Sequence, residues 1–165
     1  TQLGRALIFG TLYCLSSGTA HSVQYAMAAM PKPKLVRWMD YSEALKKAKE
    51  TPKLIFVDMY ADWCVPCRIM DANVYSDPTV ASLLNSRFYP GKLEADSQDT
   101  IMCDNQRKTV QRCYFDVWEL SALPALVLVA PKGLSILTIT DSMSPKDMQM
   151  LLYQFLEKEK EWIER

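Results

Sequence analysis

The feature that most constrains the fold is a short segment, Leu54 to Tyr60, in which Asp58 is the only charged residue. So short and so apolar a segment is typical of a strand that is covered on both faces. A strand of this kind needs packed layers above and below it. The segment therefore predicts the centre of an α/β sheet, with helices on each side.

Strand and helix signals alternate along the rest of the chain. Asp40 with Glu43 three residues later predicts a helix over residues 41–50, and Ser144-Pro145 opens a last helix whose apolar face continues to Ile163. Further helices are expected to begin near Cys64 and at Pro78, and further strands at 88–95, 125–129 and 134–139. This order predicts a central mixed β-sheet flanked by helices on both faces.

Charge and composition exclude some classes of function. The chain has 19 basic and 19 acidic residues, so it has no net charge, and 49% of its residues are hydrophobic. This balance is that of an ordinary globular domain. A nucleic-acid-binding surface would need a basic stripe, which the sequence lacks. We therefore expect no nucleic-acid partner.

The N-terminal residues differ from the rest. Arg5 precedes a short apolar run, and small residues follow at 18–20 and 26–28, as in a secretory signal. We expect a signal peptide or N-terminal anchor over 1–30, a proline-containing linker over 31–37 and one domain over 38–165. A buried N-terminal helix is the alternative. With a signal, Cys14 would be removed and the domain would lie in the periplasm or otherwise outside the cytoplasm.

The chemistry is carried by Trp63-Cys64-Val65-Pro66-Cys67, which follows the central strand and opens a helix. The amides and dipole at a helix N-terminus favour a thiolate, so Cys64 is the expected nucleophile. Cys67 lies one turn further and can close a disulfide as the resolving thiol. Pro66 fits the first helical turn, where a missing N–H is tolerated.

A Cys-x-x-Cys pair has other uses. It can be half of a zinc site, but zinc needs further ligands and the only histidine, His21, lies in the expected signal. The same absence argues against a cysteine protease. A soft-metal site for copper(I), or an adaptor that keeps a permanent disulfide, stays open as an alternative. We expect no metal and no cofactor other than the redox-active disulfide.

Two stretches carry a family resemblance. Residues 57–68, with the Trp-Cys-x-Pro-Cys core, resemble the active-site segment of thioredoxins. Continued through Val74-Tyr75-Ser76-Asp77-Pro78-Thr79-Val80, the segment is similar to the C-terminal thioredoxin-like domain of the DsbD family of thiol:disulfide interchange proteins. The resemblance covers roughly Trp38 to the C-terminus. It implies a thioredoxin-like fold with an insertion before the cis-proline strand.

The resemblance also implies supporting residues. Asp58 matches a buried carboxylate that helps to deprotonate the resolving cysteine, and burial would raise its pKa. Lys92 matches a lysine near that carboxylate, and Pro124 matches the cis-proline that faces the cysteines. A substrate could pair as an added strand beside Leu123. The expected substrate groove consists of Val65, Pro66, Ala122 and Leu123, with Trp63 at its lip.

The segment between Asp96 and Pro124 (residues 97–123, here called the insertion) is longer than in a minimal thioredoxin and contains Cys103 and Cys113. Helical spacing of apolar residues predicts a helix over 110–118. In one continuous helix the two cysteines would lie about 15 Å apart. They can pair only if the chain turns between them, near Asp104-Asn105. A structural disulfide, two free thiols and an auxiliary redox pair are the alternatives.

These observations predict a thiol–disulfide oxidoreductase that reduces protein disulfides through Cys64 and Cys67. Neither residue between the cysteines carries a charge that would stabilise a thiolate strongly, which favours a reductase over an oxidase or isomerase of the same fold. The expected partners are protein thiols and disulfides, with a membrane electron donor implied by the DsbD resemblance. We expect a monomer.

Overall fold

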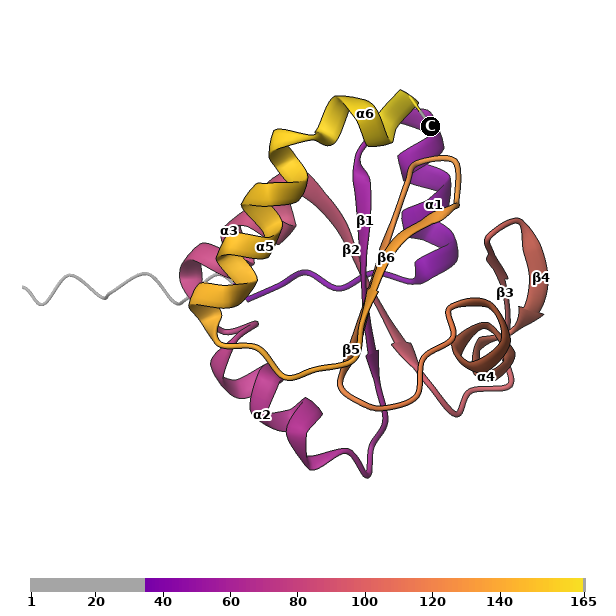
Figure 1. Cartoon of the computed structure of the whole chain (residues 1–165), viewed down its shortest axis with the longest axis horizontal. Helices are drawn as coiled ribbons and strands as arrows, with labels where there is room; N and C mark the ends of the chain where they lie inside the picture. The colour runs from indigo at the N-terminus through magenta and orange to yellow at the C-terminus, as the bar shows by residue number, and fades with distance from the viewer. Residues whose placement is uncertain (1–34, 165) are drawn as a thin grey trace, which may run out of the picture. The chain divides into compact units, whose positions relative to one another are not determined.

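The computed structural model describes residues 35–164, so the predictions for residues 1–34 lie outside the described part. Its centre is a four-stranded mixed sheet with the order β2-β1-β5-β6 (Figure 1). The strands are β1 (Leu54–Tyr60), β2 (Phe88–Glu94), β5 (Ala125–Val129) and β6 (Ser135–Ile139). β1 runs parallel to β2 and antiparallel to β5. The predicted α/β fold with a central mixed sheet is confirmed.

Alternate residues of β1 enter two different apolar clusters. Leu54 and Phe56 pack with α3 (Pro78–Arg87) and α5 (Pro145–Glu157) on one face. Ile55 and Val57 pack with α1 (Tyr41–Glu50) and the insertion on the other face (Figure 1). Because side chains of a strand alternate between faces, a run that is apolar throughout requires both layers.

Two of the predicted helix starts are stabilised by side-chain caps. The Asp40 carboxylate accepts hydrogen bonds from the amides of Ser42 and Glu43 at the start of α1. Ser144 and Asp147 form a reciprocal capping box at the start of α5. Each cap satisfies backbone N–H groups that have no partner inside the helix.

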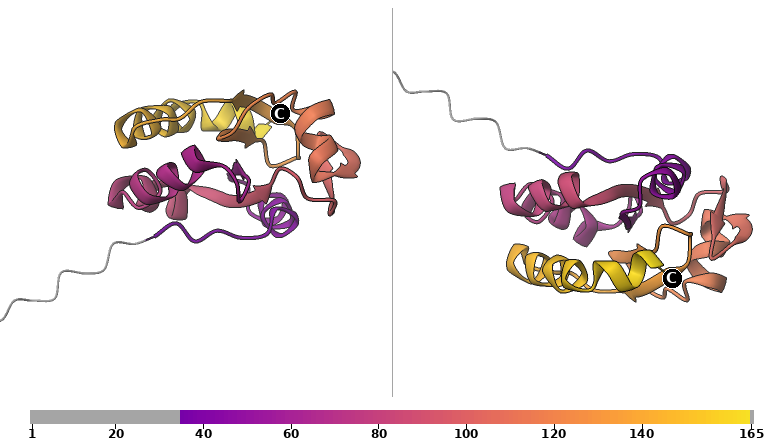
Figure 2. Two further views of the ribbon diagram at one scale, coloured as in Figure 1. Left: turned by 90° about the horizontal axis from the view of Figure 1, so that it is seen from below. Right: turned by 90° about the horizontal axis from the view of Figure 1, so that it is seen from above.

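The insertion forms a two-stranded hairpin and one helical segment beside the main sheet (Figure 2). The hairpin consists of β3 (Thr100–Cys103) and β4 (Gln106–Thr109), and the helical segment of α4 (Val110–Arg112) and the π-helix η1 (Cys113–Val117). Asp104 and Asn105 connect the strands with φ of 46° and 62°. Asn and Asp tolerate this left-handed region, which a two-residue hairpin turn requires.

Two details differ from the expectation. The last helix is not continuous, because α5 ends at Glu157 and a separate α6 (Glu159–Glu164) follows Lys158. Residues 35–37, assigned to the linker, pack on the domain: Val36 is buried, and the Arg37 amide donates to Asn85 of α3. None of the helices between residues 35 and 164 is both long and apolar enough to cross a bilayer.

Candidate active site

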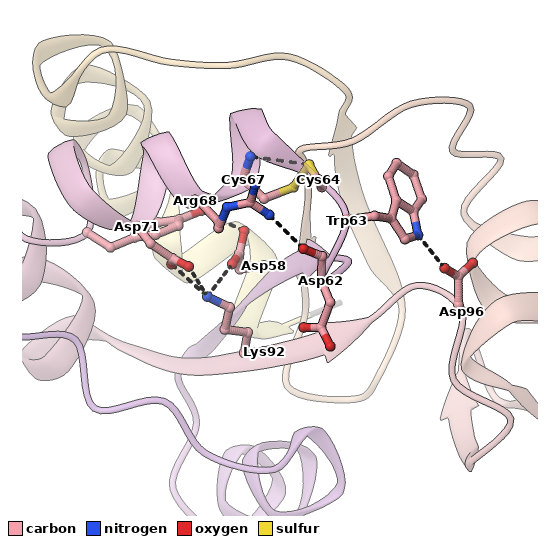
Figure 3. Close-up of a disulfide and its surroundings, with 10 residues drawn as sticks. Asp58, Asp62, Trp63, Cys64, Cys67, Arg68, Asp71, Lys92 and Asp96 are labelled. Carbon is pink, nitrogen blue, oxygen red and sulfur yellow. Dashed lines mark hydrogen bonds and ion pairs between the residues drawn. A yellow bond between two sulfur atoms is a disulfide. The ribbon is translucent and has the colours of Figure 1, made fainter.

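Cys64 is the N-cap of α2 (Val65–Asn73), directly after the loop that leaves β1. Its Sγ accepts a hydrogen bond from the Cys67 amide at 3.2 Å, in the place where a cap oxygen normally sits. The two cysteines are joined in a disulfide with their Cα atoms 5.3 Å apart (Figure 3). In the dithiol state the same amide and the helix dipole would stabilise negative charge on Cys64.

The disulfide is shielded from solvent. Cys64 is 2% exposed and Cys67 5%, and both pack with Ala61 and with the half-buried side chains of Tyr60 and Leu123. The sequence predicts an accessible Cys64, so the structure differs on this point. The reason is tertiary: Leu123, which the family resemblance places in the substrate groove, comes from the far end of the insertion and packs directly on the two cysteines.

A charged cluster around Asp58 connects β1 and β2 to α2, the helix that carries Cys67 (Figure 3). Asp58 is 3% exposed, and its carboxylate accepts a hydrogen bond from the Tyr75 hydroxyl at 2.9 Å. Lys92 is its register partner on β2, with Nζ 3.5 Å from Asp58 Oδ2. Burial raises the pKa of Asp58 to about 6, although Lys92 and the Tyr75 hydroxyl lower it. Near neutral pH this group can therefore accept and return a proton.

The ammonium group of Lys92 has further partners. It binds both carboxylate oxygens of Asp71 on α2, at 2.6 and 2.8 Å, and lies over the Trp38 and Tyr60 rings. Lysine is usually a solvated surface residue. The contacts of Lys92 instead tie β2 to β1 and to the helix that carries Cys67.

The residues expected to form the groove come from two segments, 63–66 around Cys64 and 122–123 before the cis bond. Val65 and Trp63 are exposed, and the Trp63 indole N–H donates to Asp96 Oδ2 at 2.8 Å (Figure 3). Leu123 packs on the cysteines, and the Leu123–Pro124 peptide bond is cis. Pro66 is exposed on the first turn of α2, and Ala122 is exposed beside Leu123.

Cys103 and Cys113 are joined in a second disulfide with a Cα–Cα distance of 6.0 Å. The turn at Asp104-Asn105 makes this pairing possible, because Cys103 ends β3 before the chain reverses toward Cys113. Both residues are fully buried in the apolar cluster between α1 and the insertion.

Sequence reasoning missed three polar partners of the site: Tyr75, Asp71 and Asp96. Tyr75 and Asp71 follow Cys67 on or just after α2, and Asp96 follows β2. Asp71 lies four residues after Cys67, one helical turn along, which is the one available signal. The roles of Tyr75 and Asp96 depend on tertiary contacts. Within residues 35–164 no group of three or more potential ligands lies close enough to hold a metal ion.

This geometry, a helix-capping cysteine paired with the residue one turn along and a buried carboxylate beside them, defines a thioredoxin-like thiol–disulfide oxidoreductase. The family model described as "Thioredoxin-like" matches residues 37–131. The chain belongs to the thioredoxin-like family. The resemblance seen in the sequence is thus confirmed.

Individual relatives agree with this assignment. The chain is 31% identical over 90 residues to thiol:disulfide interchange protein DsbD 1 of Pseudomonas aeruginosa, covering 54% of the chain but only 14% of that relative. A thioredoxin from Thermus thermophilus has a similar fold, with a TM-score of 0.60 at 24% identity over 74% of this chain and 88% of that one. The oxidised C-terminal domain of Neisseria meningitidis DsbD gives 0.52 at 20% identity over 68% and 89%.

Proposed function

We propose that this chain reduces protein disulfides outside the cytoplasm by a mixed-disulfide mechanism. The observation that carries the proposal is Cys64 at the N-cap of α2, with its sulfur accepting the amide hydrogen of Cys67. An oxygen at this position would only cap the helix. A sulfur there is also an activated nucleophile, because the thiolate is the reactive form.

The reaction starts from the dithiol. The Cys64 thiolate attacks one sulfur of a substrate disulfide, a Cys64–substrate bond forms, and the other substrate sulfur leaves as a thiolate. Cys67 then loses its proton and attacks Cys64 Sγ, which releases the second substrate thiolate. The substrate gains two electrons, and the chain is left with the Cys64–Cys67 disulfide seen in the structure.

Asp58 and Lys92 act on the second step. Asp58 lies in the buried cluster beside Cys67, and its raised pKa of about 6 suits a group that takes a proton from the resolving thiol. Lys92 limits that rise and holds Asp58 in place through its register position. Both are positioning or proton-transfer groups and neither forms a bond to substrate.

The substrate would lie across Trp63, Val65 and Pro66 and pair with backbone near Ala122 and Leu123 as an added strand. The cis bond before Pro124 lies at the end of this segment, directly before β5. Main-chain pairing would bring many different disulfides to Cys64 in one orientation, and side-chain contacts would then set the preference among them.

The direction is proposed to be reducing. Thiolate stabilisation at Cys64 comes from the helix start and the Cys67 amide, and residues 35–164 contain no histidine. The guanidinium of Arg68 donates to the Asp62 backbone carbonyl at 2.6 Å, so this hydrogen bond is not made to the Cys64 sulfur. We expect a redox potential closer to about −270 mV, as in thioredoxin, than to about −120 mV, as in DsbA. Equilibration with glutathione measures it, and a value near the oxidising end would overturn the reducing direction.

An extracytoplasmic location and a membrane electron donor complete the proposal. The buried Cys103–Cys113 disulfide is consistent with an oxidising compartment, and the pattern of residues 1–30 is that of an export signal. After each cycle the chain needs a dithiol that reduces Cys64–Cys67. A Cys67→Ala variant, which cannot resolve the mixed disulfide, would trap the substrates on Cys64.

The activity is tested by insulin reduction with dithiothreitol as electron source. The wild-type protein should accelerate insulin precipitation, and Cys64→Ser should show only the uncatalysed rate. A Cys103→Ala, Cys113→Ala double variant is the matched control, because it removes a disulfide without touching the proposed nucleophile. Acceleration that survives Cys64→Ser would refute the mechanism.

A further inference from the structure

A small pocket next to the disulfide is built partly from the insertion. Its volume is about 160 Å³. The lining combines residues of the expected groove with residues of the insertion and of the segment after β2. The lining residues are Trp63, Ala95, Asp96, Tyr114, Phe115, Ser121, Ala122 and Leu123. Tyr114 and Phe115 come from η1, and their rings meet edge to face at 4.8 Å.

The pocket adjoins the reacting sulfurs. Leu123 lines it and also packs on Cys64 and Cys67. Trp63 also lines the pocket and is the residue directly before Cys64 in the chain. An extended peptide advances about 3.3 Å per residue, so a side chain that enters the pocket must lie within about two positions of the cysteine that bonds to Cys64.

The chemistry of the lining selects what enters. Phe115 is 57% exposed and Trp63 68%, so both large side chains line the pocket and are largely open to solvent. Among the described residues that line the pocket there is no lysine or arginine, and the one charged group is Asp96. A cavity of about 150 Å³ accommodates a benzene ring. The pocket thus suits a leucine- or phenylalanine-sized side chain and disfavours an acidic one.

We propose that Phe115 and Tyr114 are specificity-determining residues, which bind an apolar side chain flanking the reactive cysteine of a substrate polypeptide. This inference rests on the proposed function, because it assumes that Cys64 forms the mixed disulfide. It assigns the insertion a role in choosing substrates, whereas Cys64, Cys67 and Asp58 carry the chemistry.

Two anchors hold the pocket in shape. Asp96 accepts the indole N–H of Trp63 and so fixes one wall. The buried Cys103–Cys113 disulfide fixes the other, because Cys113 directly precedes Tyr114 and Phe115 at the start of η1. The pocket is therefore held open before substrate arrives, which lowers the entropic cost of binding.

The test uses mixed-disulfide formation by the full chain carrying Cys14→Ser and Cys67→Ser, so that Cys64 is the one free thiol while Cys103 and Cys113 are paired. Short peptides with one cysteine, activated as the thionitrobenzoate disulfide, are varied within two positions of the cysteine: serine throughout, or one phenylalanine, leucine or aspartate. Cys64 attacks the peptide sulfur, the Cys64–peptide bond forms, and thionitrobenzoate leaves as a coloured thiolate. Its release gives a second-order rate constant for each peptide.

We expect phenylalanine and leucine peptides to react roughly tenfold faster than the aspartate peptide, as for apolar pockets of this kind. Phe115→Ala should reduce that preference to about threefold or less, and Phe115→Leu should largely retain it. Met102→Ala is the matched control, because Met102 is an exposed apolar residue of the same insertion that does not line the pocket.

The outcomes separate this inference from the proposed function. Equal rates for all peptides would overturn the specificity pocket while leaving Cys64 as the nucleophile. A preference that survives Phe115→Ala would overturn the assignment to Phe115. If no peptide releases thionitrobenzoate, the proposed function fails, and this inference fails with it.

Discussion

The two disulfides of this domain lie in contrasting surroundings. Cys64 and Cys67 are three residues apart at the start of a helix, next to the charged cluster of Asp58 and Lys92. Cys103 and Cys113 are ten residues apart, fully buried and enclosed by apolar side chains. Both pairs have low solvent exposure, so exposure alone does not distinguish a reactive disulfide from a structural one.

What distinguishes them is the support for an ionised sulfur. Cys64 has a helix N-terminus and the Cys67 amide, and a titratable carboxylate lies in the cluster beside the pair. Cys103 Sγ lies 3.7 Å from the Gln106 carbonyl oxygen, a group that accepts hydrogen bonds and has no hydrogen to donate to a thiolate. We therefore propose that the first pair exchanges electrons and that the second only crosslinks the fold.

The largest effect expected outside the active site follows removal of the crosslink. Cys103→Ala with Cys113→Ala should lower the free energy of unfolding by about 3 kcal/mol, the loop-closure value for ten residues. Urea unfolding at pH 7 measures it. If the double variant loses insulin reduction while it is still folded, the assignment of Cys103–Cys113 as a purely structural disulfide is wrong, because this pair would then take part in the chemistry.

Replacing the buried carboxylate of Asp58 should raise the free energy of unfolding, whereas removal of the crosslink lowers it. The folded-state pKa of Asp58, about 6, lies above its ordinary value of 3.8, so the folded protein holds this proton more tightly and stability falls as pH rises from about 3.8 to 6. Above that range the charged group destabilises the fold by up to about 3 kcal/mol. Asp58→Asn should therefore stabilise the protein by about 1 to 3 kcal/mol at pH 7, because Lys92 keeps Asp71 as a partner.

Thermal unfolding from pH 4 to pH 8 checks this dependence. The stabilisation by Asp58→Asn should shrink toward pH 4, where Asp58 is protonated in the folded state and its unfolded-state pKa of 3.8 is approached. Asp71→Asn is the control, since its ion pair with Lys92 is partly exposed and contributes about 1 kcal/mol or less. A gain that is the same at pH 4 and pH 7 would show that burial of charge is not its cause.

The smallest predicted effect concerns the hydrogen bond from the Tyr75 hydroxyl to Asp58. Tyr75→Phe removes the hydroxyl that donates to Asp58, so the pKa of Asp58 should rise further, because that hydrogen bond favours the ionised form. The loss of one buried hydrogen bond should lower stability by about 1 kcal/mol. Carboxyl chemical shifts followed by NMR titration report the pKa directly, and an unchanged or lower value contradicts the assignment.

Elements with local signals could be predicted from the sequence. The cap at Asp40 and the capping box at Ser144 mark helix starts that the structure places at Tyr41 and Pro145. The apolar run of β1 predicts its own bounds and the two layers around it. These signals depend on neighbouring residues, so they are readable without knowledge of tertiary contacts.

Elements that depend on distant contacts could not be predicted. The hairpin strands β3 and β4 are four residues each, and Gln106–Thr109 is polar throughout, so no apolar alternation marks it. The shielding of Cys64 by Leu123 and the pocket around Phe115 arise only when the insertion folds back toward α2. The break at Lys158 follows a helix whose apolar pattern continues without interruption, and no capping signal announces it.

The insertion follows β2, which ends at Glu94, and Pro124 directly precedes β5, so both of its ends are attached to strands of the main sheet. Its buried residues belong to the core, but its exposed residues can change without displacing the nucleophile, the resolving thiol or the carboxylate. Substrate preference could diverge between related proteins, or be exchanged by grafting this one segment, while electron transfer continues unaltered.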